Sequence, residues 1–429
     1  MKRVAIITLL TLTSYVGNAQ FGGILKKVKE KASSKTEEKV EDKVSSVIDN
    51  SIDKIFGIPK NKKNSSTELK DDALQSRQQD PTKKGIKSYS KFDFVPGERI
   101  VYAEDFSKDA IGEMPLNWFT QGKGELMRLE GHEGNWLRGF KSSQLSSISN
   151  VELGENYTVE FDLIYYFQPV EPVYVMPDIR IRLLNNYKKS ISGNPRNGEN
   201  SFTINIHPKE EKSIAWIDTY LDAPVFKSDD LEIPFFSTKY NVIQHYSIQV
   251  QKNRIRVWID ENKIFDIPQI IDNSRKFARI AFELGGTSYS ENEVGFFLSN
   301  IRFANGVPDT RHKLIDEGKF STTGILFALN SAEIQPSSYG VLKEISNVLK
   351  ENPNVKIKII GHTSSDGNKE SNLQLSIKRS EAIKHVLEKE FSIEISRMST
   401  EGKGDSQPVA PNSSLEGRIQ NRRVEFIKL

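Results

Sequence analysis

Hydrophobic and polar positions alternate with a period of two from about residue 98 to residue 304. Runs that are apolar at every second residue lie at residues 157–165, 179–183, 202–206, 246–250, 255–259 and 280–284, and a last run at 297–303 follows the same pattern except at Ser299. No long helical stripe separates these runs. Many half-buried strands without intervening helices are typical of an antiparallel β-sandwich. The polar segment at residues 260–263, between two of the runs, predicts a hairpin turn.

After residues 306–320, which we interpret as a connector, the pattern changes to strands that alternate with helices. The predicted order is strand, helix, strand, helix, strand, at residues 325–327, 342–349, 355–359, 372–390 and 423–429. The helices are recognised by apolar residues three and four positions apart, and the strands by alternation. This βαβαβ order predicts a small α/β domain with loops at the strand ends.

The amino-terminal part has three segments of different composition. Residues 1–19 combine Lys2 and Arg3 with a short apolar run and small residues, which is typical of a cleaved export signal; a buried strand or helix is the alternative. Residues 20–58 carry a narrow apolar stripe and predict an amphipathic helix that is solvated, docks on a partner or self-associates. Residues 59–97, rich in Lys, Ser, Asp and Gln, predict a linker.

Composition narrows the classes of partner. A chain of 429 residues is too long for one compact core, which predicts two or three domains. The 60 basic side chains face 57 acidic ones, so the net charge of +3 leaves no basic surplus for nucleic-acid phosphates. No apolar stretch is long enough to span a bilayer. Because the chain has no cysteine, we expect neither disulfides nor a lipid-modified cysteine.

Three short stretches in the β-rich region carry a family resemblance. They are EDF at Glu104–Phe106, RVWIDENKIFDIP at Arg256–Pro268 and FFLSNIRFA at Phe296–Ala304. With them, residues 98–305 resemble a concanavalin A-like (laminin G-like) jelly-roll domain. The resemblance implies a domain that binds sugars or proteins, and some relatives hydrolyse polysaccharides.

Polysaccharide hydrolysis needs two carboxylates placed across the glycosidic bond. Glu160 and Asp162 begin the pattern that sandwich-fold glycosidases carry on one strand, but Ile164 and Tyr165 occupy both places for a third carboxylate. We therefore expect both carboxylates on the solvated face of a strand, without catalysis. The aromatic residues that stack on sugar rings if exposed, and belong to the core otherwise, are Trp118, Trp136, Tyr174, Trp216 and Trp258.

Arg379 is conspicuous on the second carboxy-terminal helix. Counting by fours from Leu375 gives Arg379, Ile383 and Leu387, so the arginine is expected on a ridge that faces the core. A buried guanidinium must be paired or reach water. It is therefore either fixed in a salt bridge, to Asp366 or a neighbouring carboxylate, or kept for a ligand carboxylate that it grips with two parallel hydrogen bonds.

The loop before this helix favours a ligand carboxylate over an internal salt bridge as the partner of Arg379. It follows a strand and enters the start of a helix, where α/β folds bind anions. Asp366 in the same loop would hold an ammonium group while Arg379 holds a carboxylate. One acid and one arginine suit a zwitterionic, amino-acid-like group.

The motifs around Arg379 follow the order of a known family. They are GILFALNSAEIQP at Gly324–Pro336, GHT at Gly361–Thr363, N-x-x-L-S-x-x-R at Asn372–Arg379 and GRIQNRRVEF at Gly417–Phe426. Residues 321–429 therefore resemble an OmpA-like peptidoglycan-binding domain. The resemblance implies noncovalent binding of the diaminopimelate residue in the peptidoglycan stem peptide.

The same resemblance implies roles for single residues. The helix arginine would grip the diaminopimelate carboxylate, and the family's usual aspartate after G-H-T would hold the ammonium. This chain has Ser364 at that position, so Asp366 is expected to take over; Ala328 also stands where the family usually has an aspartate. The peptidoglycan-binding residues implied are Asn330, Thr363, Ser364, Asp366, Asn372 and Arg379.

Other polar side chains near the carboxy terminus have open roles. Three arginines either contact the stem peptide or wall phosphates, or pair with Glu416 and Glu425: Arg418, Arg422 and Arg423. His312 and His362 lack the neighbouring ligands of a metal site, so we expect no metal or cofactor.

These inferences predict an exported, non-enzymatic protein of a Gram-negative envelope, in the periplasm or associated with the outer membrane. Its carboxy-terminal domain would bind peptidoglycan, and its β-sandwich would present a surface for a glycan or a protein. One alternative is a wall or polysaccharide hydrolase on a peptidoglycan anchor. The other is a structural assembly subunit whose carboxy-terminal domain has lost ligand binding, for which Ser364 is the best sign.

Overall fold

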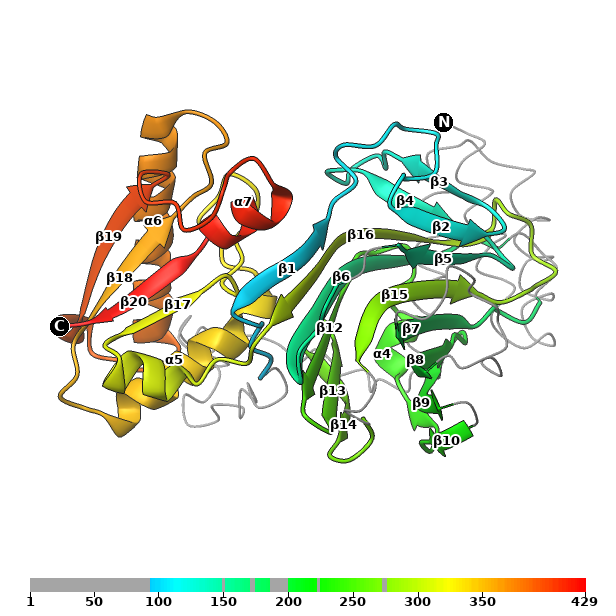
Figure 1. Cartoon of the computed structure of the whole chain (residues 1–429), viewed down its shortest axis with the longest axis horizontal. Coiled ribbons are helices and arrows are strands. Elements are labelled where there is room, and N and C mark those ends of the chain that lie inside the picture. Colours follow the sequence, from blue (N-terminus) through cyan, green and yellow to red (C-terminus); the bar gives the residue numbers. More distant parts are fainter. Residues whose placement is uncertain (1–92, 149–150, 170–173, 186–199, 222–223, 272–275) are drawn as a thin grey trace, which may run out of the picture. The chain divides into compact units, whose positions relative to one another are not determined.

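The computed structural model describes residues 93–148, 151–169, 174–185, 200–221, 224–271 and 276–429 (Figure 1). The predicted export signal, the predicted amphipathic helix and most of the predicted linker lie outside the described residues and stay predictions. The described residues all belong to one compact unit. In this part of the chain, no helix is both long enough and apolar enough to cross a membrane.

Residues 99–305 fold into two sheets of eight strands each (Figure 1). The strands of the first sheet are β1 (Arg99–Glu104), β3 (Gly124–Met127), β4 (Trp136–Gly139), β6 (Asn156–Phe167), β12 (Gln244–Gln251), β13 (Arg254–Ile259), β14 (Asn262–Ile267) and β16 (Val294–Asn305). Their order is β14-β13-β12-β6-β16-β4-β3, with β1 also paired to β16.

The second sheet lies against the first. Its strands are β2 (Trp118–Gln121), β5 (Gln144–Ser147), β7 (Ile179–Asn185), β8 (Asn200–His207), β9 (Ile214–Leu221), β10 (Pro224–Lys227), β11 (Leu231–Glu232) and β15 (Phe277–Leu284), with the short helix α4 (Pro234–Ser237) after β11. Their order is β10-β9-β8-β7-β15-β5-β2, with β11 paired to β9. The described strand pairs of both sheets are antiparallel.

The inward side chains of the two sheets form one apolar cluster. Phe161 of β6 stacks on Tyr246 of β12 with ring centroids 4.9 Å apart, and it meets Phe282 of β15 edge-on at 5.0 Å. The first contact lies within one sheet, and the second joins the two sheets. The prediction of antiparallel sheets is confirmed, and so is the hairpin turn between β13 and β14. The jelly-roll connectivity stays a prediction.

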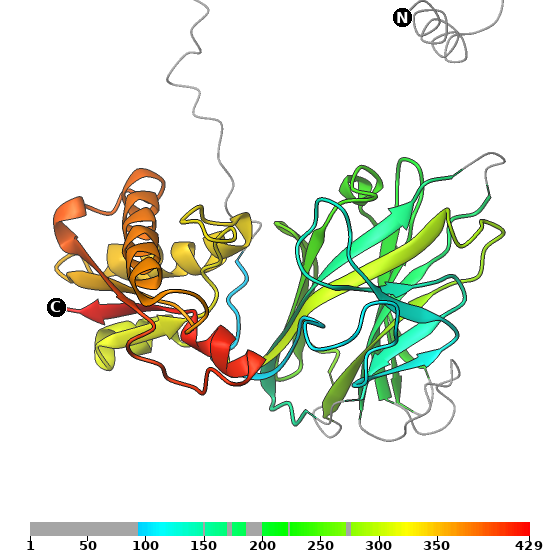
Figure 2. The ribbon, with the colours of Figure 1, turned by 90° about the horizontal axis from the view of Figure 1, so that it is seen from above.

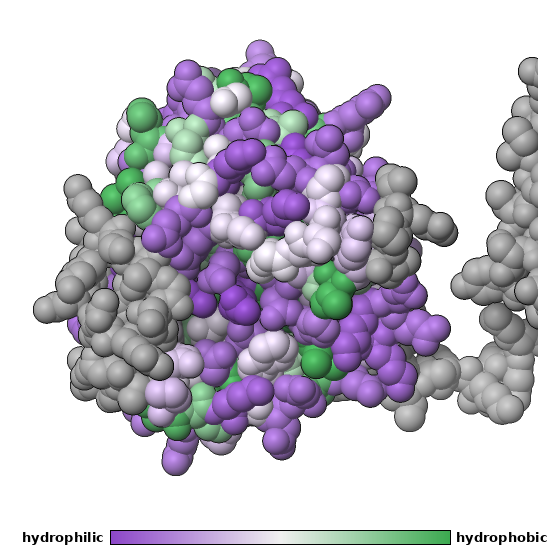
Figure 3. All heavy atoms as spheres, turned by 90° about the vertical axis from the view of Figure 1, so that its right-hand side faces the viewer, coloured by the Kyte–Doolittle hydropathy of each residue, from purple (hydrophilic) through white to green (hydrophobic). Residues whose placement is uncertain are grey.

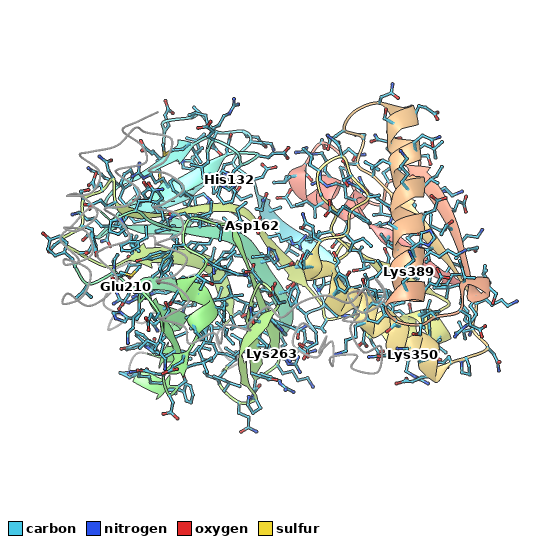
Figure 4. The ribbon with its side chains drawn as sticks, turned by 180° about the vertical axis from the view of Figure 1, so that it is seen from behind. His132, Asp162, Glu210, Lys263, Lys350 and Lys389 are labelled. Atoms are coloured by element: carbon cyan, nitrogen blue, oxygen red, sulfur yellow. The ribbon has the colours of Figure 1, made fainter. Side chains whose placement is uncertain are left out.

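The predicted solvated face at Glu160 and Asp162 is wrong. Glu160 is only 2% exposed and forms an ion pair with Arg302 of β16. His245 of β12 lies between the two carboxylates, with Nδ1 2.7 Å from Asp162 Oδ1 and Nε2 3.4 Å from Glu160 Oε2. Asn300 donates a hydrogen bond to Asp162, which is labelled in Figure 4. We call these five residues the Glu160 network.

The carboxy-terminal domain is a four-stranded sheet with two long helices on one face (Figures 1 and 2). Its elements are η2 (His312–Asp316), β17 (Lys319–Thr322), η3 (Pro336–Ser338), α5 (Tyr339–Glu351), β18 (Ile357–His362), α6 (Lys369–Lys389), η4 (Ile395–Arg397), β19 (Met398–Gly404), α7 (Leu415–Asn421) and β20 (Val424–Lys428). The strand order is β17-β20-β18-β19, and only β18 and β19 run parallel among the described pairs of this sheet.

The predicted βαβαβ order needs three corrections. Ile325–Phe327 is not a strand of the sheet, because Phe327 makes only an isolated bridge with Ile334. The first strand is β17, which begins inside the predicted connector, and its Phe320 is fully buried in the core of this domain. The strand β19 (MSTEGKG) and the helix α7 were not predicted, because β19 has one apolar residue and α7 is too short to show a period.

Helix α6 packs on the sheet through small residues, and Arg379 is not on its buried ridge. The buried residues of α6 are Asn372, Ser376, Ser380, Ile383 and Leu387. A Cβ atom on Gly361 of β18 would lie 2.3 Å from the Ser376 carbonyl oxygen, and one on Gly402 of β19 would lie 2.4 Å from the Ser376 hydroxyl. This close approach of helix and strands buries one side of α6, and Arg379 lies half-buried outside that side.

We expect Gly361→Ala to lower the free energy of unfolding by about 1–3 kcal/mol, because the new methyl group displaces the backbone of α6. The measurement is hydrogen exchange of the β18 amides in the full chain, which should become faster. Gly154→Ala is the matched control: its Cβ would meet nothing closer than 4.0 Å, and the change should stay within about 0.5 kcal/mol. Equal exchange in the two variants would contradict the close packing.

Helix α7 covers the exposed edge of strand β1. Gln420 accepts a hydrogen bond from the Ile100 amide at 3.1 Å and donates one to the Glu98 carbonyl at 3.1 Å. Glu416 accepts one from the Ala103 amide at 3.3 Å. An unpaired strand edge is thereby satisfied by side chains. These contacts fix the helix that carries Arg418 and precedes Arg422.

Candidate functional site

Arg379 is held by a backbone carbonyl and an aromatic ring. Its Nε donates a hydrogen bond to the Ser331 carbonyl at 3.0 Å, and its guanidinium carbon lies 4.8 Å from the Phe327 ring centroid. Among the described residues, no carboxylate oxygen lies within 4.0 Å of this guanidinium, and its two terminal nitrogens donate no hydrogen bond. The structure therefore does not show the internal salt bridge that was the alternative to a ligand.

Burial, followed by repulsion from Arg422, lowers the pKa of Arg379. The group nevertheless stays a cation at neutral pH, because guanidinium does not deprotonate in proteins. A half-buried cation whose two terminal NH₂ groups lie side by side matches the geometry of a carboxylate. The contact with Phe327 holds the plane of the guanidinium in place.

The loop between β18 and α6 is closed by its own hydrogen bonds. Asn372 Nδ2 donates to the Asp366 carbonyl at 2.9 Å and to the Ser364 carbonyl at 3.3 Å. The Asn368 side chain caps α6 by accepting from the Glu370 and Ser371 amides. The structure thus places Asn372 as a residue that shapes the loop, buried beneath the site.

Thr363, in the same loop, has a buried hydroxyl group without a hydrogen-bond partner among the described residues. It is 5% exposed, its amide donates to the Gly404 carbonyl at 2.9 Å, and its hydroxyl has no hydrogen-bond partner among the described residues. A buried hydroxyl without a partner is unfavourable by itself. The pocket role predicted for Thr363 stays a prediction.

Asp366 points toward two arginines. Its Oδ2 accepts a hydrogen bond from the Ser364 hydroxyl at 2.8 Å, and it lies 3.7 Å from Arg418 Nε and 3.6 Å from Arg422 NH1. The side chain of Asp366 is 60% exposed. The departure at Ser364 is thus linked to Asp366 directly, as the sequence suggested, but the partners of Asp366 are cations.

Asn330 lies beside the site without a side-chain contact. It has a positive φ of 49° and is exposed, and its side chain makes no hydrogen bond to a described residue. The backbone turn at Asn330 presents the next carbonyl, that of Ser331, to Arg379. Asparagine tolerates this left-handed conformation better than most residues.

The third arginine near the carboxy terminus is structural. Arg423 is 4% exposed, and its Nε donates to Glu425 Oε1 at 2.9 Å. Burial would raise the pKa of Glu425, but its contacts with His362, Lys319 and Arg423 keep it well below its ordinary value. His362 Nε2 lies 3.7 Å from Glu425 Oε2, which is too long for a hydrogen bond.

Sequence reasoning did not identify two parts of the site. Phe327 was assigned to a strand, and the Ser331 carbonyl belongs to the backbone, which no residue type reveals. Arg418 and Arg422 were considered, with pairing to Glu416 and Glu425 as the alternative. The described residues contain no group of three or more His, Asp or Glu side chains arranged to hold a metal ion.

The aromatic candidates of the β-sandwich fall into two groups. Trp118, Trp136 and Trp258 are at most 4% exposed and belong to the interior, so they are not available for stacking on sugars. Trp216 is half-buried with Lys227 Nζ 5.3 Å from its ring centroid, and Tyr174 is 41% exposed. The face on the side of β8, β9 and β10 is largely hydrophilic (Figure 3).

Known proteins match the carboxy-terminal part of the chain. Outer membrane porin F of Pseudomonas aeruginosa is 36% identical over 101 residues, which is 24% of this chain and 29% of the relative. Probable lipoprotein YiaD of Escherichia coli is 37% identical over 102 residues, 24% of this chain and 46% of the relative. Peptidoglycan-binding protein ArfA of Mycobacterium bovis is 31% identical over 103 residues, 24% of this chain and 31% of the relative.

The chain thus spans less than half the length of each of these relatives. The model of the OmpA family also matches this chain, over residues 326–422. The match includes the loop after β18 and the helix α6. The carboxy-terminal domain of this protein is therefore a domain of the OmpA family.

Proposed function

We propose that this protein is a non-enzymatic component of the bacterial envelope that binds peptidoglycan noncovalently through its OmpA family domain. The observation that carries the proposal is the free guanidinium of Arg379, half-buried and without a carboxylate partner among the described residues. A buried cation with unused donors is costly unless a ligand anion completes it. The relative from Mycobacterium bovis, named as peptidoglycan-binding, supports the class of ligand.

The ligand group is the side-chain carboxylate of diaminopimelate in the stem peptide. Two parallel hydrogen bonds from the terminal nitrogens of Arg379 would hold it, while Nε keeps its bond to Ser331. Thr363 supplies a hydroxyl at the same loop. Lysine, which replaces diaminopimelate in some walls, lacks this carboxylate and would leave Arg379 unpaired.

The β-sandwich would present a second surface, for a glycan or a protein, on a concanavalin A-like jelly roll. Trp216 and Tyr174 are the aromatic residues exposed enough to take part. The predicted export signal and the relatives named as an outer membrane porin and a lipoprotein support a place in the periplasm or at the outer membrane.

The two alternatives have less support. A hydrolase needs carboxylates free to act as acid and base, whereas Glu160 and Asp162 are engaged by Arg302 and His245. An assembly subunit that has lost ligand binding would have no reason to keep Arg379 without a partner.

Cosedimentation of the full chain with purified sacculi tests the proposal. We expect the protein to pellet with sacculi that contain diaminopimelate and to stay in solution with sacculi that contain lysine. Arg379→Ala should weaken binding about tenfold or more, because it removes two charge-assisted hydrogen bonds.

Arg311→Ala is the matched control for this experiment. Arg311 is exposed and has no ion pair with a described residue, so its loss should leave binding unchanged. If the wild-type chain stays in solution with both kinds of sacculi, the proposed function is wrong.

A further inference from the structure

Two arginines face one carboxylate at the candidate site, and a third, Arg379, is close enough to Arg422 to be repelled by it. Arg422 NH1 and Arg418 Nε lie 3.6 Å and 3.7 Å from Asp366 Oδ2, both beyond hydrogen-bond distance. The same oxygen accepts the Ser364 hydroxyl. An aspartate that already faces two guanidiniums is a poor partner for a ligand ammonium, because both cations repel the approaching group.

The site has a surplus of positive charge. Three guanidiniums, those of Arg379, Arg418 and Arg422, stand against the single carboxylate of Asp366. Their mutual repulsion acts on their pKa values: burial and then Arg422 lower the pKa of Arg379, while burial lowers the pKa of Arg422 against the attraction of Asp366. A second bound anion would relieve this repulsion.

The guanidiniums of Arg418 and Arg422 also have unused hydrogen-bond donors. Within the described residues, the Arg422 guanidinium donates no hydrogen bond, and Arg418 donates only a long one, 3.4 Å, to the Asn412 carbonyl. Two charges of the β-sandwich act on Arg422 with opposite signs: Asp105 raises its pKa, and Arg302, with the smaller effect, lowers it. The β-sandwich therefore offsets only part of the surplus.

We propose that the site binds a peptide with two free carboxylates, one held by Arg379 and the other by Arg418 and Arg422. This proposal rests on the proposed function and names the form of wall peptide that the site selects. In the stem peptide a γ-linked glutamate precedes diaminopimelate, and its α-carboxylate is free unless it is amidated. The domain would thus prefer unamidated peptidoglycan.

A direct titration of the full chain with two soluble peptides tests the proposal. The first is L-Ala-γ-D-Glu-diaminopimelate with its terminal α-carboxyl blocked as a methylamide, so that two carboxylates remain. The second is identical except that the glutamate carboxylate is amidated. We expect amidation to weaken binding about tenfold or more, because one charge-assisted contact is lost.

Equal affinity for the two peptides would overturn this proposal and leave the proposed function intact. No binding of either peptide, with no binding to sacculi, would overturn both. This comparison uses the wild-type chain, so it decides the matter even if a variant at the site fails to fold.

Two variants locate the second carboxylate. Arg422→Gln should lower the affinity for the unamidated peptide to that for the amidated one, and should leave the amidated peptide unaffected. Asp366→Asn should keep or increase the affinity for the unamidated peptide, because it removes a competing anion. A tenfold loss in Asp366→Asn would instead establish the ammonium role and overturn the proposal. Arg311→Gln is the control for a change of net charge.

Discussion

Arg302→Met is expected to lower the free energy of unfolding of the β-sandwich by about 3–5 kcal/mol. Arg302 of β16 forms an ion pair with Glu160, which is 2% exposed, and one oxygen of that carboxylate already lacks a hydrogen-bond partner among the described residues. Removing the arginine leaves a buried carboxylate with only His245 beside it, 3.4 Å away. A buried charge without adequate compensation is among the costliest changes in a protein interior.

The measurement is denaturant unfolding followed by tryptophan fluorescence. The chain has four tryptophans, and all four lie in the β-sandwich, so the signal reports the unfolding of that domain alone. Arg254→Met is the matched control. Arg254 pairs with Asp266 at 2.7 Å, but its side chain is 42% exposed, and such surface pairs contribute only about 0–1 kcal/mol.

A double variant separates charge from packing. Glu160→Gln combined with Arg302→Met removes both charges, and neutral replacements for a buried ion pair are often well tolerated. We therefore expect the double variant to recover a large part of the stability lost in Arg302→Met. A loss below about 1 kcal/mol in Arg302→Met would show that the Glu160 network does not stabilise the fold.

The β-rich region was predictable because its strands bury one face and not the other. Alternation at residues 157–165 identified β6 and its inward side chains correctly. Alternation says nothing about what neighbouring strands place on the outward face. His245 and Arg302 reach Glu160 from positions 85 and 142 residues away, and no local pattern reveals such pairings.

The carboxy-terminal domain shows the same limit at its site. The motif order located Arg379 and the loop after β18, because both depend on residue types at fixed spacings. Counting by fours placed Ile383 and Leu387 on the buried ridge correctly but placed Arg379 there as well. In the first half of α6 the ridge instead consists of Asn372, Ser376 and Ser380, with Ser376 against glycines of the sheet. Small polar residues that allow close packing do not register as hydrophobic, so the periodicity missed this half of the ridge.

The neighbours of Asp366 come from a distant part of the chain. Arg418 and Arg422 lie about 50 residues further along and reach it through the position of α7. From the sequence, Asp366 was available to hold an ammonium. The structure places it beside two cations, and our proposal of a ligand with two carboxylates starts from this difference.

The stability of the β-sandwich is expected to fall as the pH rises from about 6.5 to about 9. Burial by itself would lower the pKa of His245, but hydrogen bonds to Asp162 and Glu160 and the charge of both raise it from 6.5 to about 9. A group whose folded pKa is raised stabilises the fold fully below its unfolded pKa and loses that contribution as the pH passes the folded pKa. Screening by water at a side chain that is 19% exposed limits the effect to roughly 1–3 kcal/mol.

The contribution of Glu160 to stability changes with pH in the opposite direction to that of His245. Burial raises its pKa, but Arg302 and His245 outweigh burial and lower it below 4.5, so its contribution is present above pH 4.5 and is lost as the pH falls through the lower folded value. The two groups together predict a maximum of stability between about pH 4.5 and 6.5. Buried tyrosines such as Tyr246, whose pKa is raised above 10, act only at higher pH and leave the window from 6.5 to 9 to His245.

Unfolding midpoints measured by tryptophan fluorescence at half-unit steps from pH 5.5 to 9.5 test this expectation. His245→Gln keeps a hydrogen-bonding side chain beside Asp162 but does not titrate, so its stability should be lower at pH 6 and nearly flat up to pH 9. The wild-type and variant curves should therefore converge as the pH rises, because deprotonated His245 no longer compensates the two carboxylates. Parallel curves would mean that the pKa of His245 is the same in the folded and unfolded protein, and that Asp162 and Glu160 do not stabilise its charged form.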